Sequence, residues 1–581
     1  MTTDKLYLYW HTLRHLKPVQ LYGRLWFRLY RPYVSKSAIV PPLHEPQYRW
    51  QKPAVYAPSM LGAQQFRFLN QEHSLPPIAD GWNDDTVPEK LWLYNLHYFD
   101  DLNARDANTR SAWHRAWLHR WLAENMPAKS IGWEPYPTSL RIVNWIKWLA
   151  AGNLALPGML VSLSIQTKWL TQRLEWHLMG NHLFKNAKAL VFVGLFFDGS
   201  QAASWLAKGL RIISHELPEQ VLADGGHFEL SPMYHAIFLE DLLDLINAAS
   251  HWPGRVPDSQ IVRWRHVASD MLYWLAGMTH PDGEFALFND AAFNIAPNLA
   301  ELRSYAMRLG IEDRLQQPTS SISTPCSRND EEIPNEDSDP TIRREVNQSL
   351  LSLLHFPSSG YVRIENNNAV AFLDIAPVGP DHLPAHAHAD TLSFELSVFG
   401  QRVVVNGGTS RYGLGSERQR ERGTSSHSTS EIMGQNSSEV WGGFRVARRA
   451  YPFDFQVHEE EELLKVECSH DGYTNLPYKP VHRREWVMDA CSLWVMDEVR
   501  GGQYHALARY ILHPSIQIDA IDVNNWKISL PGGQNLRVTV LEGCAQLVPA
   551  LYAPEFGTVL PTQCLAVEFT QTQATTKWQW N

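Results

Sequence analysis

The sequence predicts a multidomain α+β protein in which a helical region precedes an antiparallel β-sandwich. Two observations support this fold class: the period of the apolar residues changes along the chain, and a polar, acidic stretch separates the two patterns. A chain of 581 residues is also longer than a single hydrophobic core supports. We expect a partly helical N-terminal extension at 1–80, a helical domain at 81–315, an acidic linker at 316–347 and a β-domain at 348–581.

The helical region is predicted by apolar residues that recur at helical spacing between about residues 107 and 309. The clearest segments are 139–149, 183–192 and 202–213. Clusters of Pro, Gly and Asn, such as Gly180-Asn181, interrupt the pattern. Helices joined by short turns predict a helical hairpin array or a toroid.

The β-domain is predicted by a change to alternating apolar and polar residues after the acidic stretch. The predicted strands are 360–365, 369–374, 392–398, 463–468, 493–499 and 536–540. Many strands with turn signals and few helices are typical of a large antiparallel sandwich.

Composition is that of a globular protein and excludes several classes of function. Hydrophobic residues make up 44% of the chain, and the formal net charge of −10 argues against a general nucleic-acid binder. The 5 scattered cysteines indicate free thiols rather than a disulfide framework. No apolar run is long enough for a transmembrane helix. Nothing in the composition predicts an oligomeric state.

The N-terminal segment does not match an export signal, because a basic region, an apolar core and a small-residue cleavage site are all missing. The sequence alone therefore favours a cytoplasmic or membrane-associated protein. Between His11 and Tyr33, Arg and Lys alternate with Leu, Tyr, Trp and Phe. Such a segment suits a membrane surface, but we expect an amphipathic helix packed on the next domain.

The most informative stretch is His386-Ala-His388-Ala-Asp390. In an extended segment, residues two apart project to the same side, so these three side chains would form one polar row. Imidazoles and a carboxylate on a buried face need partners. A catalytic or metal-binding site would supply them, and so would a hydrogen-bonded pair of loop histidines.

Other polar motifs lie where the helical pattern breaks. Asn181 precedes a predicted helix, where a plain N-cap is the simplest interpretation. A tyrosine at the start of a helix, such as Tyr234, is usually a packing residue. The motifs are Trp133-Glu-Pro-Tyr136 with Arg141, Gly180-Asn181-His182, and Asp224 to His235 with Glu229 and Tyr234.

Taken together, these motifs resemble the heparinase II/III-like polysaccharide lyase family. The resemblance rests on 180–190, 224–235, 386–390 and 422–429, in that order along the chain. It implies an incomplete (α/α) toroid followed by an antiparallel β-sandwich. It also implies cleavage of acidic polysaccharides by β-elimination and, for most members, a periplasmic location.

The resemblance assigns catalytic roles to four residues. Elimination removes the proton α to a uronate carboxylate and expels the 4-linked sugar, so the carboxylate must be neutralised and two protons must move. Asn181 would bind the carboxylate with help from His182 or His386, and Tyr234 would carry protons with His386 as its neighbour. Which residue takes which proton depends on the uronate epimer, which the sequence does not specify.

Further residues are assigned to substrate binding with less support. Trp133, Tyr136 and Arg141 would line the cleft, or would only pack. Glu229 would position the catalytic groups, or would only cap a helix. Arg418, Arg420 and Arg422 would meet an acidic polymer, or would lie in a solvated loop.

The resemblance also implies a structural divalent metal, most often zinc, held by two histidines and an aspartate. His388 and His427 occupy the histidine positions, but Asn406 stands where the aspartate is expected. A neutral amide oxygen is a poorer zinc ligand than a carboxylate. Asp390 is the alternative third ligand, and the histidines would otherwise only hydrogen-bond. Because His386 and His388 would serve different sites, we expect a kinked loop rather than a strand here.

Three functions therefore follow from the sequence. The leading one is a lyase acting on an acidic, uronate-containing polysaccharide, either an exopolysaccharide or a glycosaminoglycan-like polymer. The second is a catalytically inactive glycan-binding protein in exopolysaccharide biosynthesis. The third is a glycoside hydrolase on the same scaffold, which would need two carboxylates across the cleft, with Glu229 and either Asp390 or Glu134 as candidates.

Overall fold

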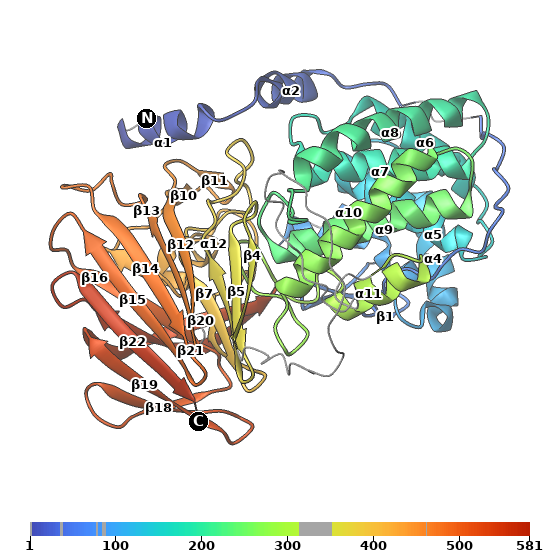
Figure 1. Ribbon diagram of the computed structural model, residues 1–581. Helices are drawn as coiled ribbons and strands as arrows, with labels where there is room; N and C mark the ends of the chain where they lie inside the picture. Colours follow the sequence, from blue (N-terminus) through green and yellow to red (C-terminus); the bar gives the residue numbers. More distant parts are fainter. Residues whose placement is uncertain are drawn as a thin grey trace, which may run out of the picture.

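The computed structural model describes residues 3–34, 39–76, 79–83, 89–312, 351–460 and 462–580. A helical half and a β-half lie side by side, and an N-terminal arm runs along one edge of both (Figure 1). This architecture confirms the predicted fold class. The predicted acidic linker at 316–347 lies outside the described residues.

The helical half is built around one buried helix, α7, which is apolar on every side along its second half, as expected for a helix with no solvent face. Helices α5, α8 and α9 pack around it. The helices of this half are α3 (Lys90–Tyr98), α4 (Ser111–Glu124), α5 (Pro135–Ala150), α6 (Met159–Gln172), α7 (Gly180–Phe196), α8 (Ser200–Gln220), α9 (Pro232–His251), α10 (Asp258–Gly277) and α11 (Leu299–Arg308). Short 3-10 turns accompany them: η1 (Ala79–Asn83), η2 (Asp100–Asn103), η3 (Ala107–Arg110) and η4 (Ile131–Trp133).

The β-half contains two large antiparallel sheets. Within the described residues, one sheet has 9 strands in the order β20-β21-β16-β8-β7-β6-β5-β4, with β9 pairing β16, and the other has 8 in the order β12-β13-β14-β15-β22-β19-β18-β17. Buried and half-buried residues alternate along β14, and the buried set faces the shared core with Trp486 and Trp578.

The bounds of these strands agree with the predicted segments to within a few residues. The strands are β4 (Leu351–Phe356), β5 (Tyr361–Asn366), β6 (Ala369–Asp374), β7 (Phe394–Val398), β8 (Gln401–Val405), β9 (Ser430–Ile432), β10 (Val440–Trp441), β11 (Arg445–Val446), β12 (Pro452–Glu460), β13 (Leu463–His470), β14 (Val481–Met488), β15 (Ser492–Arg500), β16 (Ala506–Leu512), β17 (Gln517–Ala520), β18 (Asn525–Ser529), β19 (Asn535–Glu542), β20 (Cys544–Glu555), β21 (Thr558–Glu568) and β22 (Gln573–Trp580). Helix α12 (Ser416–Glu421) and turn η6 (Thr424–Ser426) interrupt them.

The N-terminal arm consists of α1 (Thr3–Leu13) and α2 (Pro18–Leu29) and connects the two halves. On the β-side, the indole of Trp441 donates to the Thr12 hydroxyl (3.1 Å). On the helical side, Arg173 donates to the carbonyl of Phe27 (2.8 Å). A small sheet of β1 (Met60–Gly62), β2 (Gln65–Phe68) and β3 (Gln71–Ser74) follows the arm. No described helix is long and apolar enough to cross a membrane.

The segment from His386 to Asp390 lies in the loop between β6 and β7, so the expected kinked loop is confirmed. Both sides of this loop are held by backbone hydrogen bonds. The amide of Asp290 donates to the carbonyl of His386 (2.9 Å), and the amide of Ala389 donates to the carbonyl of Arg422 (2.9 Å). The loop is therefore clamped between the helical half and the β-half.

Candidate active site

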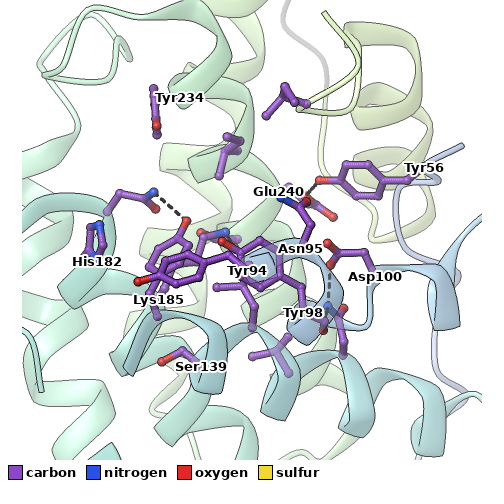
Figure 2. Close-up of a pocket in the computed structure, with 18 of the residues that line it drawn as sticks. Tyr56, Tyr94, Asn95, Tyr98, Asp100, Ser139, His182, Lys185, Tyr234 and Glu240 are labelled. Atoms are coloured by element: carbon purple, nitrogen blue, oxygen red, sulfur yellow. Dashed lines mark hydrogen bonds and ion pairs between the residues drawn. The ribbon is translucent and has the colours of Figure 1, made fainter. Parts of the chain in front are cut away.

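Two adjoining cavities share the residues that the sequence analysis placed at the centre of catalysis. The first has a volume of about 360 Å³ and opens inside the helical half, and the second, of about 520 Å³, lies beneath the N-terminal arm. Asn181, His182 and His386 line both. Tyr136 and Tyr234 line the first and Glu229 lines the second. Figure 2 shows Tyr234 and His182 on two sides of the first cavity.

Asn181 is placed by an unusual start to α7. The cap residue Met179 and the first helical residue Gly180 both have positive φ angles, 59° and 49°. A Cβ on Gly180 would come within 2.6 Å of the Leu383 side chain, so glycine suits both the positive φ and this close approach. Asn181 therefore lies inside the first turn and is not an N-cap. Its amide donates to the Tyr136 hydroxyl (3.1 Å), and the positive end of α7 faces the same cavity.

Tyr234 lies in the first turn of α9, where the Ser231 side chain accepts from its backbone N–H (3.2 Å). Its ring lies over the His386 imidazole, with 3.9 Å between the ring centroids. Its hydroxyl is 2.8 Å from that of Tyr412. Burial, together with Tyr412 and the negative charge of Asp290, raises the pKa of Tyr234 well above its ordinary value. Tyr234 is therefore a neutral phenol that can donate a proton.

Asp290 holds the imidazoles of the histidine loop. Its carboxylate accepts from Nδ1 of His386 (2.9 Å), from Nε2 of His388 (2.8 Å) and from both terminal nitrogens of Arg418. Burial alone would raise the pKa of Asp290, but the Arg418 charge and the two histidine hydrogen bonds hold it well below its ordinary value. Because an ionised carboxylate only accepts, Nδ1 of His386 and Nε2 of His388 each carry a proton.

Two carboxylates stand next to the imidazoles of His182 and His386. Glu175 lies 3.2 Å from Nδ1 of His182, and this neighbour raises the pKa of His182 although burial opposes the shift. Oε2 of Glu229 lies 3.8 Å from Nε2 of His386 and has no hydrogen-bond partner among the described residues. Burial raises the pKa of Glu229. His182 is thus favoured as a cation, which suits an anionic ligand.

The predicted metal-binding histidines lie together behind the cavity. Nδ1 of His388 is 3.3 Å from Nε2 of His427, and Asp390 offers an oxygen within 4.8 Å of both. Two nitrogens bound to one tetrahedral zinc at about 2.0–2.1 Å would be about 3.3 Å apart. These three residues therefore fit a divalent metal, and Asp290 orients His388 from the far side, as outer partners of metal ligands do.

The predicted ligand Asn406 has hydrogen-bond partners of its own within the protein. Its side-chain oxygen accepts from the backbone N–H of Ser428 (3.2 Å), and its amide group lies 3.4 Å from the hydroxyl of Ser393. Its polar atoms are thus engaged in holding neighbouring segments together. Asp390, the alternative named from the sequence, completes the group with the two histidines.

The structure also contradicts the prediction that Trp133 and Arg141 line the cleft. Both are buried, and neither lines the two cavities. Arg141 stacks on Trp121 (4.1 Å to the ring centroid) and donates to Gln166 (2.9 Å). The sequence pattern of an aromatic loop followed by a helix with an arginine is the same in a sugar-binding site and in a hydrophobic core. Of this loop, Tyr136 alone reaches the cavity with Asn181.

Several residues of the site were not predicted. Asp290, Tyr412 and Glu175 had no assigned role, and Arg418, expected to be in a solvated loop or on the polymer, is fully buried against Asp290. The floor of the first cavity is a buried network of lysines and carboxylates, part of which is visible in Figure 2: Lys147, Lys185, Lys188, Asp241 and Asp244. The sequence signal for this network was the presence of Lys185 and Lys188 within the apolar helix α7, because a buried lysine needs a buried partner.

Comparison with known families agrees with this geometry. The family model for the heparinase II/III N-terminus matches residues 78–308, and the model for the heparinase II/III-like C-terminal region matches 349–581. The chain belongs to the heparinase II/III-like family. Asn181 and Tyr234 lie in the first matched region, and the histidine loop lies in the second.

Individual relatives are more distant. A heparin-sulfate lyase from Bacteroides stercoris is 32% identical over 113 residues, which are 19% of this chain and 17% of that protein. One from Pedobacter heparinus is 28% identical over 115 residues, with the same coverage of 19% and 17%. The matched segment is therefore a small part of the length of these relatives.

Solved structures show that the fold is shared over a much longer span. A crystal structure of heparinase III has a TM-score of 0.65 at 17% identity, covering 96% of this chain and 88% of that one. The heparan sulfate lyase structure from Pedobacter heparinus has a TM-score of 0.53 at 16% identity, covering 89% and 81%. The toroid and sandwich arrangement is thus that of the family.

The corrected role of Arg141 is testable. Replacing Arg141 with Met removes its buried hydrogen bonds and its contact with Trp121, so we expect the free energy of unfolding to fall by about 3 kcal/mol. Chemical denaturation measures this loss. A substrate-contacting arginine would behave in the opposite way, with unchanged stability and a weakened affinity for the polymer.

Proposed function

We propose that this protein is a polysaccharide lyase that cleaves an acidic, uronate-containing polysaccharide by β-elimination. The observation that carries the proposal is the meeting of Asn181, Tyr234 and His386 at one cavity, although they come from three distant segments. Together they offer a carboxylate-binding amide, a proton donor and a proton acceptor. These are the groups that elimination at a uronate requires.

The carboxylate of the scissile uronate would lie against Asn181 at the positive end of α7. His182, favoured as a cation by Glu175, would stabilise the charge that moves onto the carboxylate when the α-proton leaves. Tyr136 would hold the amide of Asn181 in place through their hydrogen bond.

The two proton transfers would be divided between His386 and Tyr234. With its Nδ1 proton held by Asp290, His386 presents a free lone pair on Nε2, which would take the α-proton. The electron pair left behind forms the new C=C bond, and the C4–O bond breaks. Tyr234, a neutral phenol, would donate its proton to the departing oxygen.

The hydrolase alternative is not supported by the two carboxylates named as partners for Glu229. Asp390 is buried and lines neither cavity, and Glu134 is paired with Lys90 (2.8 Å). Neither of them faces Glu229 across the cleft as hydrolysis would require. The named relatives are heparin-sulfate lyases, which favours an acidic, glycosaminoglycan-like substrate.

A structural divalent metal, zinc in our proposal, would be held by His388, Asp390 and His427. Bound there, it would stabilise the loop that carries His386. The proton transfers would remain with His386 and Tyr234.

The lyase proposal is tested by the ultraviolet absorbance of the unsaturated uronate, measured on a panel of uronate polymers. We expect the wild-type protein to produce this signal and Tyr234→Phe to reduce kcat by at least about 100-fold, because the proton donor is lost. Tyr98→Phe, in the same cavity but away from His386, is the matched control and should stay within about twofold of wild type. A folded wild-type protein that binds a polymer without producing the signal would favour the glycan-binding alternative.

The metal assignment is tested by elemental analysis of the purified protein. We expect about one equivalent of divalent metal in the wild type, with a lower Tm after chelation because a ligand of the native state is removed. His427→Ala should lose the metal, whereas Asn406→Ala should keep it. If Asn406→Ala loses the metal and His427→Ala keeps it, Asn406 is a metal ligand, as the sequence resemblance implied.

A further inference from the structure

The second cavity contains cations that the proposed chemistry does not use. Its walls come partly from the N-terminal arm, through Tyr9, Thr12 and Arg24, and partly from β11, through Arg445. Asn181, His182 and His386 lie in the same cavity. The arm lies outside both regions matched by the family models.

Most charges along this cavity are already paired. Arg449 pairs with Asp381, and His382 lies 3.3 Å from Glu219. By contrast, neither Arg24 nor Arg445 has a carboxylate within ion-pair distance among the described residues. Burial lowers the pKa of Arg24, and the positive charge of the nearby Arg445 lowers it further.

Arg445 is held in place rather than free. Its guanidinium lies 4.7 Å from the centroid of the Trp441 ring and 5.7 Å from that of Tyr9. Stacking of this kind fixes the orientation of the group and leaves its N–H edge available for an anion. The side chains of Arg24 and Arg445 are both exposed to solvent, line the same cavity and have no acidic partner among the described residues, so an anionic ligand in that cavity can reach both charges.

We propose that Arg24 and Arg445 form an anion-binding subsite for a carboxylate or sulfate ester on a sugar adjoining the scissile uronate. The proposal rests on the proposed function, since the polymer would run from the catalytic residues into the second cavity. It assigns a substrate-binding role to the N-terminal arm.

The test compares Arg24→Gln and Arg445→Gln with Arg28→Gln, a cation of the same helix that lines neither cavity. The probes are heparan sulfate oligosaccharides and the same oligosaccharides after chemical desulfation. We expect the two cavity variants to raise KM and Kd about tenfold, with kcat within about twofold of wild type and a weaker salt dependence, while Arg28→Gln matches wild type. A loss confined to the sulfated probe identifies the anion as a sulfate ester, and a loss with both identifies a carboxylate.

The proposed subsite is overturned if Arg24→Gln and Arg445→Gln both bind the oligosaccharides with wild-type affinity. It is also overturned if the wild-type protein binds neither probe. Kd is measured separately from turnover, which keeps the two proposals apart. If the wild type binds oligosaccharides without forming unsaturated product, the lyase function fails while the subsite is still judged by Kd.

The opposite side of the arm presents an independent feature. The chain has 23 tryptophans, all within the described residues, and the exposed ones are Trp10 (66%), Trp26 (62%) and Trp176 (45%). The first two lie on the arm, and Trp176 is next to His177, whose ring packs on Phe27 of α2. The other exposed large apolar residues of α1 and α2 are Leu6, Tyr7, Leu13, Leu21, Tyr22, Leu25 and Leu29.

On each helix, consecutive exposed apolar residues are one or three residues apart in the sequence, which places them in one stripe along the helix. The opposite face of α2, with Gln20 and Gly23, is buried against the body of the protein. The expectation of a helix packed on the next domain thus holds for one face only. In Figure 1 the arm lies at the outer edge of the molecule, and the side chains of the apolar stripe are exposed.

Charge distinguishes this surface from the rest of the protein. Residues 3–34 contain 6 Lys or Arg and 1 Asp, whereas the whole chain has a net charge of −10. Tryptophan, tyrosine and leucine flanked by arginines are the composition of helices that lie in the interface of an anionic membrane. We infer that the outer face of α1 and α2 docks on an anionic lipid surface.

The test is flotation with vesicles of phosphatidylcholine, with and without phosphatidylglycerol. We expect the wild type to float with the anionic vesicles, less so at high salt, and Leu25→Ser combined with Trp26→Ser to reduce binding at least tenfold. Leu154→Ser, an exposed leucine far from the arm in sequence, is the matched control and should bind normally. The inference is overturned if the wild-type protein floats with neither kind of vesicle. It is also overturned if the wild-type protein is a dimer in solution and the double substitution makes it a monomer, because the outer face of α1 and α2 would then bind a second copy of the chain.

Discussion

The buried carboxylate of Asp290 is the interaction on which the rest of the site depends. It belongs to the helical half, between α10 and α11, yet its partners His386, His388 and Arg418 all belong to the β-half. A buried charge is tolerated only when it is paired and fully hydrogen-bonded, so these partners must be in place for the two halves to fit together. The contacts that join the two halves at Asp290 are therefore the same contacts that orient His386 and His388.

Asp290 also explains how one short loop serves two purposes. It binds His386 through Nδ1 and His388 through Nε2, so the two rings present opposite nitrogens to their surroundings. His386 is left with Nε2 free next to Tyr234, while His388 turns Nδ1 toward His427. A regular strand would have placed both side chains on one face, which is why the kinked loop is needed.

Much of this was predictable from the sequence, because periodicity locates helices and strands and because His386, Asn181 and Tyr234 lie in distinctive motifs. Asp290 was not predictable. It lies in an apolar loop, and its partners lie about a hundred residues later along the chain. Trp133 and Arg141 were assigned wrongly because a cation stacked on an aromatic ring serves a core and a sugar site equally well. Burial decides between these roles, and single sequences do not report it.

The most direct test of the account is the tautomeric state of the two loop histidines, read by nitrogen NMR of histidine-labelled protein with single His→Gln variants for assignment. The account predicts the Nδ1–H tautomer for His386 and the Nε2–H tautomer for His388, because Asp290 accepts from those nitrogens. An Nε2–H tautomer at His386, or a ring that exchanges freely between both forms, would contradict it.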